Sequence, residues 1–181
     1  MKRKALRRKP VARKAVAKKS VARKKPKVRA IPAGYRSVTA YLSIRGAAQA
    51  IEYYKLAFEA VETMRMPGPE GQVGHAEIQI GDSIVMLSDE YPGIDFLGPK
   101  SRGGTTVPMH LYVKDVDATV ARAVAGGARV IKPVEDQFYG DRRGTIEDPF
   151  GHVWHVATHI EDPSEAEVIR RLRKLEQQAG G

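Results

Sequence analysis

Apolar and polar residues alternate in short stretches along most of this chain, which is the period of half-buried strands. The first such stretch runs from Ser37 to Arg45, and the last runs from His152 to Thr158. Between residues 47 and 58, apolar side chains recur instead at the spacing of one helix face. These patterns predict strands at residues 37–45, 59–66, 73–80, 83–88, 106–113, 128–134, 143–147 and 152–158, and helices at 47–58, from Asp115 or Asp117 to Ala125, and from a capping box at Ser164–Glu167 onward.

The predicted order of one strand, one helix and three strands occurs twice, and the two copies share one register. Tyr41 and His110 are 69 residues apart, and Met86 and His155 are separated by the same 69 residues. An offset that holds at both ends of a unit indicates an internal duplication rather than chance similarity. The chain is therefore predicted to contain two βαβββ modules in tandem.

Basic charge is concentrated at the start of the chain. Residues 1–29 hold 15 of the 31 Lys and Arg and no acidic residue, whereas the rest of the chain has 16 basic and 21 acidic groups. So much like charge with so little apolar area predicts a disordered tail over residues 1–34. Its Ala/Lys/Pro-rich composition resembles that of linker-histone tails and predicts sequence-independent binding of nucleic acid through Met1–Arg29. The alternative is a solvated extension that meets polyanions only incidentally.

The remaining composition limits the class of protein. The chain has no cysteine, so a disulfide framework is excluded and a reducing compartment is compatible with the sequence. No apolar run approaches the roughly 18 residues that a membrane span requires. We expect a cytoplasmic protein with one folded domain at residues 35–162 and a C-terminal helix with a frayed end at residues 163–181. The tail adds the option of association with the nucleoid.

Three segments carry a resemblance to a known family: Tyr41–Lys55, Val113–Asp117, and the Asp-Pro-Phe-Gly turn at Asp148–Gly151. From about residue 35 to residue 163, the chain resembles the vicinal-oxygen-chelate superfamily of glyoxalases, bleomycin-resistance proteins and extradiol dioxygenases, and in particular its PhnB-like branch. The resemblance implies an α+β fold in which the mixed sheets of two modules face each other around a cavity, with the helices outside. It also implies ligand binding in the groove between modules, often in a homodimer.

Alternation along the predicted strands places polar side chains on the face that the helices do not cover. In the fold that the resemblance implies, this face lines the cavity. The predicted ligand-binding residues are Thr39, Tyr41, Glu77, Met86, His110, Tyr112 and His155. Met64, Met66 and Met109 are interpreted as core filler. Asp141–Arg143 is interpreted as a solvated salt-bridge cluster or, alternatively, as a group that closes the cavity on an anionic ligand.

The metalloenzymes of this superfamily use four inward ligands on the first and last strands of each module. The resemblance carries these positions to Thr39, Met86, Pro108 and His155. Only His155 suits a divalent metal, because Met prefers soft ions and Pro offers no side-chain donor. We therefore expect no metal and no other cofactor.

The leading hypothesis is a metal-independent protein that binds a small molecule, probably too broad a class to name the ligand from sequence, and that forms a homodimer. A second hypothesis is a glyoxalase-like lyase or isomerase. The expected pairing of Glu77 with Met86 across the Gly81–Asp82 hairpin would turn Glu77 toward His110 and His155, as ligands of a displaced divalent metal or as acid–base groups. A third hypothesis is a nucleoid-associated accessory protein that acts through its tail.

Overall fold

A computed structural model describes residues 28–179 of the chain, so most of the predicted tail lies outside the described residues. The chain divides into two units, Met1–Ala30 and Ile31–Gly181, and the second unit holds every helix and strand that follows. Among residues 28–179, no helix combines the length and apolar character needed to cross a bilayer.

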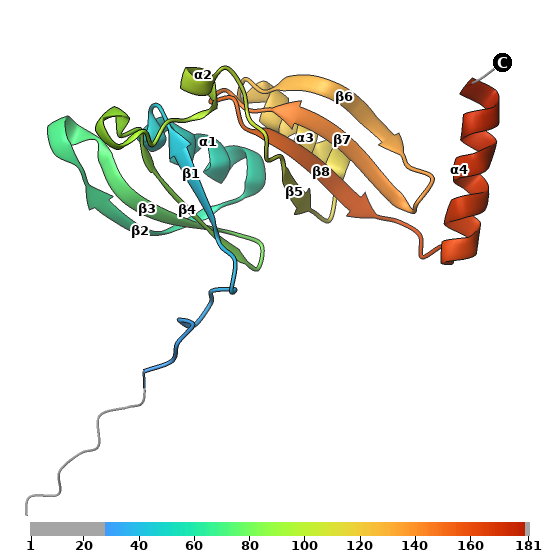
Figure 1. Cartoon of the computed structure of the whole chain (residues 1–181), viewed down its shortest axis with the longest axis horizontal. Coiled ribbons are helices and arrows are strands. Elements are labelled where there is room, and N and C mark those ends of the chain that lie inside the picture. Colours follow the sequence, from blue (N-terminus) through green and yellow to red (C-terminus); the bar gives the residue numbers. More distant parts are fainter. Residues whose placement is uncertain (1–27, 180–181) are drawn as a thin grey trace, which may run out of the picture. The chain divides into compact units, whose positions relative to one another are not determined.

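The first module consists of β1 (Ala40–Ile44), α1 (Ala47–Phe58), β2 (Val61–Pro67), β3 (Val73–Ile80) and β4 (Ser83–Asp89). Its four strands form one sheet in the order β1-β4-β3-β2. The pairing of β1 with β4 is parallel, and the other pairings are antiparallel. Figure 1 shows this module in blue to green.

The second module repeats this topology with β5 (Met109–Tyr112), α3 (Val116–Ala125), β6 (Arg129–Asp136), β7 (Asp141–Glu147) and β8 (Val153–His159). Its sheet order is β5-β8-β7-β6, and β5 pairs with β8 in parallel. The predicted α+β fold of two tandem βαβββ modules with mixed sheets is therefore confirmed.

Short helical segments lie where the sequence pattern predicts only loop. These are η1 (Pro69–Gly71), η2 (Pro92–Ile94) and α2 (Pro99–Arg102). Each begins at a proline, whose fixed φ suits the first position of a helix, and each is too short to display a helical period. This explains why the periodicity of the sequence does not reveal them.

Strand register follows the predicted alternation. Glu77 pairs with Met86 across the β3–β4 hairpin, as predicted, and Met86 pairs with Tyr41 of β1. In the second module, His110 of β5 pairs with His155 of β8. Since paired residues share a face, the polar residues gather on one face of each sheet.

The opposite, apolar faces form a core that both modules share. Phe58 and Tyr54 of α1 contact Trp154 of β8, with ring centroids 4.7 and 5.5 Å apart, respectively. The Tyr53 hydroxyl donates to the carbonyl oxygen of Ala123 in α3 at 3.4 Å. Helix α1 therefore packs on the second module as well as on its own sheet, so the two modules stabilise one another.

A buried carboxylate in the Asp-Pro-Phe-Gly turn reinforces this junction. Asp148 Oδ1 accepts hydrogen bonds from the backbone N–H groups of Phe150 and His152, each at 2.9 Å. Its Oδ2 accepts from the Tyr54 hydroxyl at 2.8 Å and from Trp154 Nε1 at 2.9 Å. Burial, and after it the charge of Asp148, raises the pKa of Tyr54 well above its ordinary value, so this hydroxyl remains a donor. Asp148 thus joins the turn, β8 and helix α1.

The chain ends with helix α4 (Glu165–Ala179). Only half of the predicted capping box forms: Glu167 N donates to Ser164 Oγ at 3.3 Å, whereas the Glu167 carboxylate pairs with Arg170 and Arg171. The arginines attract this carboxylate more strongly than a neutral backbone N–H group can. Ile169 and the apolar residues one and two turns later remain exposed.

Candidate functional site

The open face of the first sheet, which is the face away from α1, holds predicted residues Tyr41, Glu77 and Met86 in one row of paired strands. Leu42 and Leu87, their sequence neighbours, lie on the covered face and are buried. Tyr41 is exposed, Met86 is half-buried and Glu77 is buried. The structure therefore brings three of the predicted ligand-binding residues together on one surface.

Two methionines on this open face do not fit the prediction. Met64 and Met66 pair with Glu77 and His75 in β3, and their exposed fractions are 39% and 48%. Their interpretation as core filler is wrong, because a register shift between Glu62 and Met64 sets these side chains on the face away from the helix. Met109, in contrast, packs against the core as predicted.

Hydrogen bonds fix Glu77 in position. The Tyr35 hydroxyl donates to Glu77 Oε2, and His75 Nε2 lies 3.3 Å from Glu77 Oε1. The other ring nitrogen of His75, Nδ1, lies 3.0 Å from the Tyr41 hydroxyl, and the two rings stack. The bond to Glu77 raises the pKa of Tyr35. The sequence pattern identifies neither Tyr35 nor His75 as part of the site; an unpaired Tyr just before the first strand is the only signal for Tyr35.

Thr39 stands apart from this network. It lies immediately before β1, and its hydroxyl donates to the carbonyl oxygen of Arg36 in a long contact of 3.4 Å. The side chain is half-buried and makes no hydrogen bond with Tyr41, Glu77 or Met86 among the described contacts. Its predicted role in ligand binding remains a prediction.

The open face of the second sheet holds the other three predicted residues. The His110 and His155 ring centroids are 6.1 Å apart, and the His110 and Tyr112 centroids are 4.7 Å apart. His155 Nδ1 lies 3.0 Å from the Thr145 hydroxyl on β7. The Tyr112 hydroxyl donates to Asp141 Oδ2 at 3.0 Å, although the residue as a whole is 61% exposed. His110, Tyr112 and His155 therefore form a second polar cluster.

Positive charge surrounds His155. Burial lowers the pKa of His155 most, and the charges of Arg143, His110 and Lys132 lower it further. His155 is consequently neutral at neutral pH, and its imidazole can donate a hydrogen bond from one nitrogen while accepting one at the other.

Arg142 and Arg143 have different surroundings. Arg142 pairs with Asp117 at 2.7 Å and with Asp136 at 2.9 Å, which confirms the predicted salt-bridge cluster for this residue. Arg143, on the other face of β7, makes no ion pair within residues 28–179 and lies 5.9 Å from the ring centroid of Tyr139. Asp141 binds His159 and Tyr112 instead of either arginine.

The residues at the superfamily's metal-ligand positions do not fit a divalent ion. Thr39 and Pro108 lie just before β1 and β5, while Met86 and His155 lie on the open faces of different sheets. Proline has no donor atom in its side chain and the thioether is a soft ligand, so His155 is the single suitable donor in this set.

The alternative site of Glu77, His110 and His155 is not formed within one chain. Across residues 28–179, no three His, Asp or Glu side chains come together as they would around a metal. Glu77 belongs to the first sheet and is held by Tyr35 and His75, whereas both histidines belong to the second sheet. The predicted meeting of these residues is therefore wrong for a single chain, because the two open faces belong to separate sheets.

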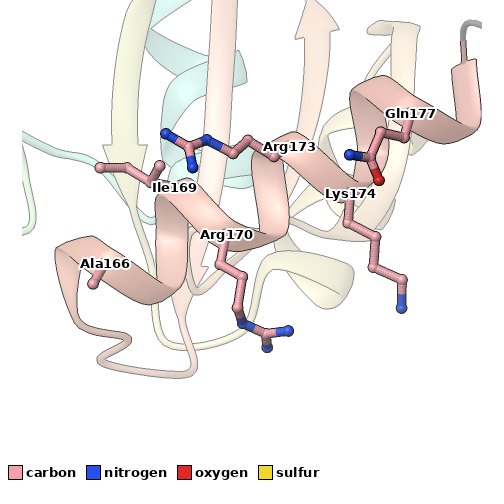
Figure 2. Close-up of a pocket in the computed structure, with 6 residues that line it drawn as sticks. All are labelled: Ala166, Ile169, Arg170, Arg173, Lys174 and Gln177. Carbon is pink, nitrogen blue, oxygen red and sulfur yellow. The ribbon is translucent and has the colours of Figure 1, made fainter.

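Cavities in the single chain lie elsewhere. One of about 1050 Å³ lies between the modules and is lined by Phe58, Ile80, Leu111, Arg122 and Thr158, among others. Another of about 590 Å³ borders Tyr41, Phe96 and His152. A third depression, of about 380 Å³, is lined by α4 alone, so it has no opposing wall; Figure 2 shows its lining residues, Ala166, Ile169, Arg170, Arg173, Lys174 and Gln177. The open sheet faces are therefore broad surfaces rather than enclosed pockets.

Comparison with known proteins agrees with this architecture. Residues 38–156 match the family model described as the Glyoxalase/Bleomycin resistance protein/Dioxygenase superfamily. An uncharacterized protein of Mycobacterium tuberculosis, strain H37Rv, is 42% identical over 135 residues, which are 73% of this chain and 79% of the relative.

Two solved structures share the fold. A gene product of Arabidopsis thaliana superimposes with a TM-score of 0.56 at 26% identity, covering 68% of this chain and 98% of that one. A PhnB protein from Bacillus cereus gives a TM-score of 0.56 at 17% identity, covering 68% and 99%. The second likeness agrees in fold with the predicted PhnB-like branch.

Proposed function

Because the chain belongs to the Glyoxalase/Bleomycin resistance protein/Dioxygenase superfamily, we propose that it binds a small organic molecule on the open faces of its two sheets. The observation that carries this proposal is the placement of polar and aromatic side chains on faces that the helices leave uncovered. Tyr41 and Tyr112 each combine an exposed ring with a hydroxyl held by a neighbouring side chain. Such amphipathic side chains are suited to an organic ligand.

We propose that binding does not involve the superfamily's four-ligand metal centre. The support is the chemistry of Thr39, Met86, Pro108 and His155, which provides one good donor where four are needed. Chemistry that depends on a metal to polarise the substrate would lack its ligands at these positions.

A second copy of the chain completes the site in this proposal. Met64, Met66 and Tyr112 are large apolar side chains left exposed on the open faces. A homodimer that sets the first sheet of one protomer opposite the second sheet of its partner would cover these side chains and enclose a groove. Exposed apolar surface of this kind favours association.

His155→Ala is expected to weaken ligand binding about tenfold, because the loss of one hydrogen bond to a buried or half-buried partner is worth about 1 kcal/mol or slightly more. Ligand-observed NMR against a library of small organic molecules identifies binders, and isothermal titration then measures the affinity. His159→Ala, a substitution at the far end of the same strand, serves as the matched control and should leave the affinity within about twofold.

Elemental analysis separates this proposal from the enzyme hypothesis. Protein purified without chelator should contain no stoichiometric metal. A tightly bound ion, one per chain in the parent protein and lost in His155→Ala, would overturn the proposal and favour a metal-dependent lyase or isomerase.

We further propose that residues 1–29 bind nucleic acid without sequence preference. Composition supports this, because the segment holds 15 of the 31 Lys and Arg and no acidic residue. Fluorescence anisotropy with a DNA duplex should show affinity that falls at least about 1000-fold between about 50 and 200 mM salt, as for six or more phosphate contacts. A variant that begins at Ala30 should lose this binding and keep its melting temperature. Salt-insensitive binding, or equal binding by the shortened variant, would contradict the proposal.

A further inference from the structure

The open face of the second sheet carries a row of cationic and neutral donors across all four strands. Lys132 of β6 pairs with Thr145 of β7, Thr145 pairs with His155 of β8, and His155 pairs with His110 of β5. Arg143 lies two residues from Thr145 on β7 and therefore points to the same face, in the next row. Lys132 and Arg143 thus project from neighbouring strands onto one surface.

The carboxylates near this face are engaged elsewhere. Asp141 binds His159 and Tyr112, and Glu147 binds Arg129. Glu135 is in register with Arg143, but the two side chains make no ion pair within 4.0 Å. Within residues 28–179, neither Lys132 nor Arg143 therefore has an anionic partner.

The structure holds the Arg143 guanidinium in place. The side chain is half-buried, and the guanidinium carbon lies 5.9 Å from the ring centroid of Tyr139, within cation–π range. A guanidinium that is already ordered and partly dehydrated loses less entropy and less hydration when an oxyanion binds. The lowered pKa of His155, which Arg143 and Lys132 help to cause, shows that their field reaches the middle of the face.

Resting on the proposed function, we infer that the ligand carries an oxyanion, a carboxylate or a phosphate group, and that Arg143 binds it as the principal cation with help from Lys132 and His155. The planar guanidinium matches two oxygens of such a group. When Thr145 Oγ1 donates to His155 Nδ1, the proton of the neutral imidazole is on Nε2, which then donates to the anion.

The first sheet is suited to the other end of the ligand. Its open face carries Met64, Met66 and Tyr41, which offer apolar and aromatic contact. It also carries Glu77, whose negative charge repels an oxyanion. The chemical class is therefore an organic acid with an apolar body, oriented with its acidic end on the second sheet.

The test uses the full chain and three probes: inorganic phosphate, benzoate and benzamide. Two-dimensional NMR of the histidine imidazoles reports binding at His155 and His110 separately from any phosphate held by the basic tail. Benzoate and phosphate should shift the His155 resonances and raise its pKa, and benzamide, the uncharged counterpart of benzoate, should bind at least about tenfold more weakly.

Arg143→Gln should weaken benzoate binding at least about tenfold, whereas Arg129→Gln should change it less than about twofold. Arg129 is a matched control, because it also lies on β6 or β7 but pairs with Glu147. Arg143→Gln should also raise the pKa of His155 without any ligand, because it removes one of the charges that lower it. Arg143→Lys, which keeps the charge and loses the fork, should bind with intermediate affinity and serves if the glutamine variant is poorly folded.

Three results would overturn the inference: equal benzoate binding by the parent and Arg143→Gln, equal losses in Arg143→Gln and Arg129→Gln, or no response of His155 to either anion. Benzamide binding as tight as benzoate binding would also overturn it, while leaving the proposed small-molecule function in place. Stronger binding of benzoate than of phosphate identifies the carboxylate as the acidic group, and the reverse order identifies the phosphate.

Discussion

Asp148→Ala is expected to lower the free energy of unfolding by about 3 to 5 kcal/mol, because it leaves several buried donors without an acceptor. The carboxylate is buried and accepts from Phe150 N, His152 N, the Tyr54 hydroxyl and Trp154 Nε1. A methyl group accepts none of these bonds, and water has little access to the donors. Urea unfolding followed by tryptophan fluorescence measures the loss.

Asp82→Ala is the control for this prediction. Asp82 is an exposed aspartate in the turn of the other module and pairs with Arg36 on the surface. Its removal should cost less than about 1 kcal/mol. Asp148→Asn should lie between the two, since it keeps one acceptor oxygen and sets an amide N–H group against other donors. If Asp148→Ala unfolds at the same urea concentration as Asp82→Ala, the four hydrogen bonds do not stabilise the junction.

Trp154→Ala should cost about 3 to 5 kcal/mol through the cavity it leaves in the core. Trp154 is 2% exposed and packs against Tyr54 and Phe58 of the first module's helix. Because these contacts cross between modules, the variant should still unfold in one transition, with both modules destabilised together. Calorimetry measures the shift in melting temperature and tests for a single transition.

Ile94→Ala provides the comparison for the core substitution, because Ile94 is also a large apolar residue but is exposed. It should change stability by less than about 0.5 kcal/mol. Two separate transitions in Trp154→Ala would show that the modules unfold independently. The effects of Asp148→Ala and Trp154→Ala should not add in the double variant, because the two side chains share a hydrogen bond.

The sequence alone predicts those parts of the fold that depend on local alternation. The period of two along the strands, together with the repeated offset of 69 residues, leads to the pairings of Glu77 with Met86 and of His110 with His155. Burial of one face per strand makes such a register hard to shift, because a slip of one residue would expose the whole apolar set.

Other features depend on contacts between distant residues, which a sequence period does not encode. Tyr35 joins Glu77 across 42 positions of the chain, and no local pattern marks either residue for the other. The exposure of Met64 and Met66 follows from a register shift in β2 that leaves the composition of the strand unchanged. The separation of Glu77 from His110 and His155 depends on how the two sheets are arranged, which lies beyond pairing within each sheet.

The two modules also differ in the hairpin that joins their last two strands. In the first module, two residues separate Ile80 from Ser83, whereas in the second, five residues separate Glu147 from Val153. Asp148 occupies this additional length, so the first module has no counterpart for it. The duplicated halves have consequently become complementary parts of a latch: one half provides the phenol and aromatic rings, the other the carboxylate that receives them. A chain built from two copies of the first half would repeat the strand order and lack the fastening.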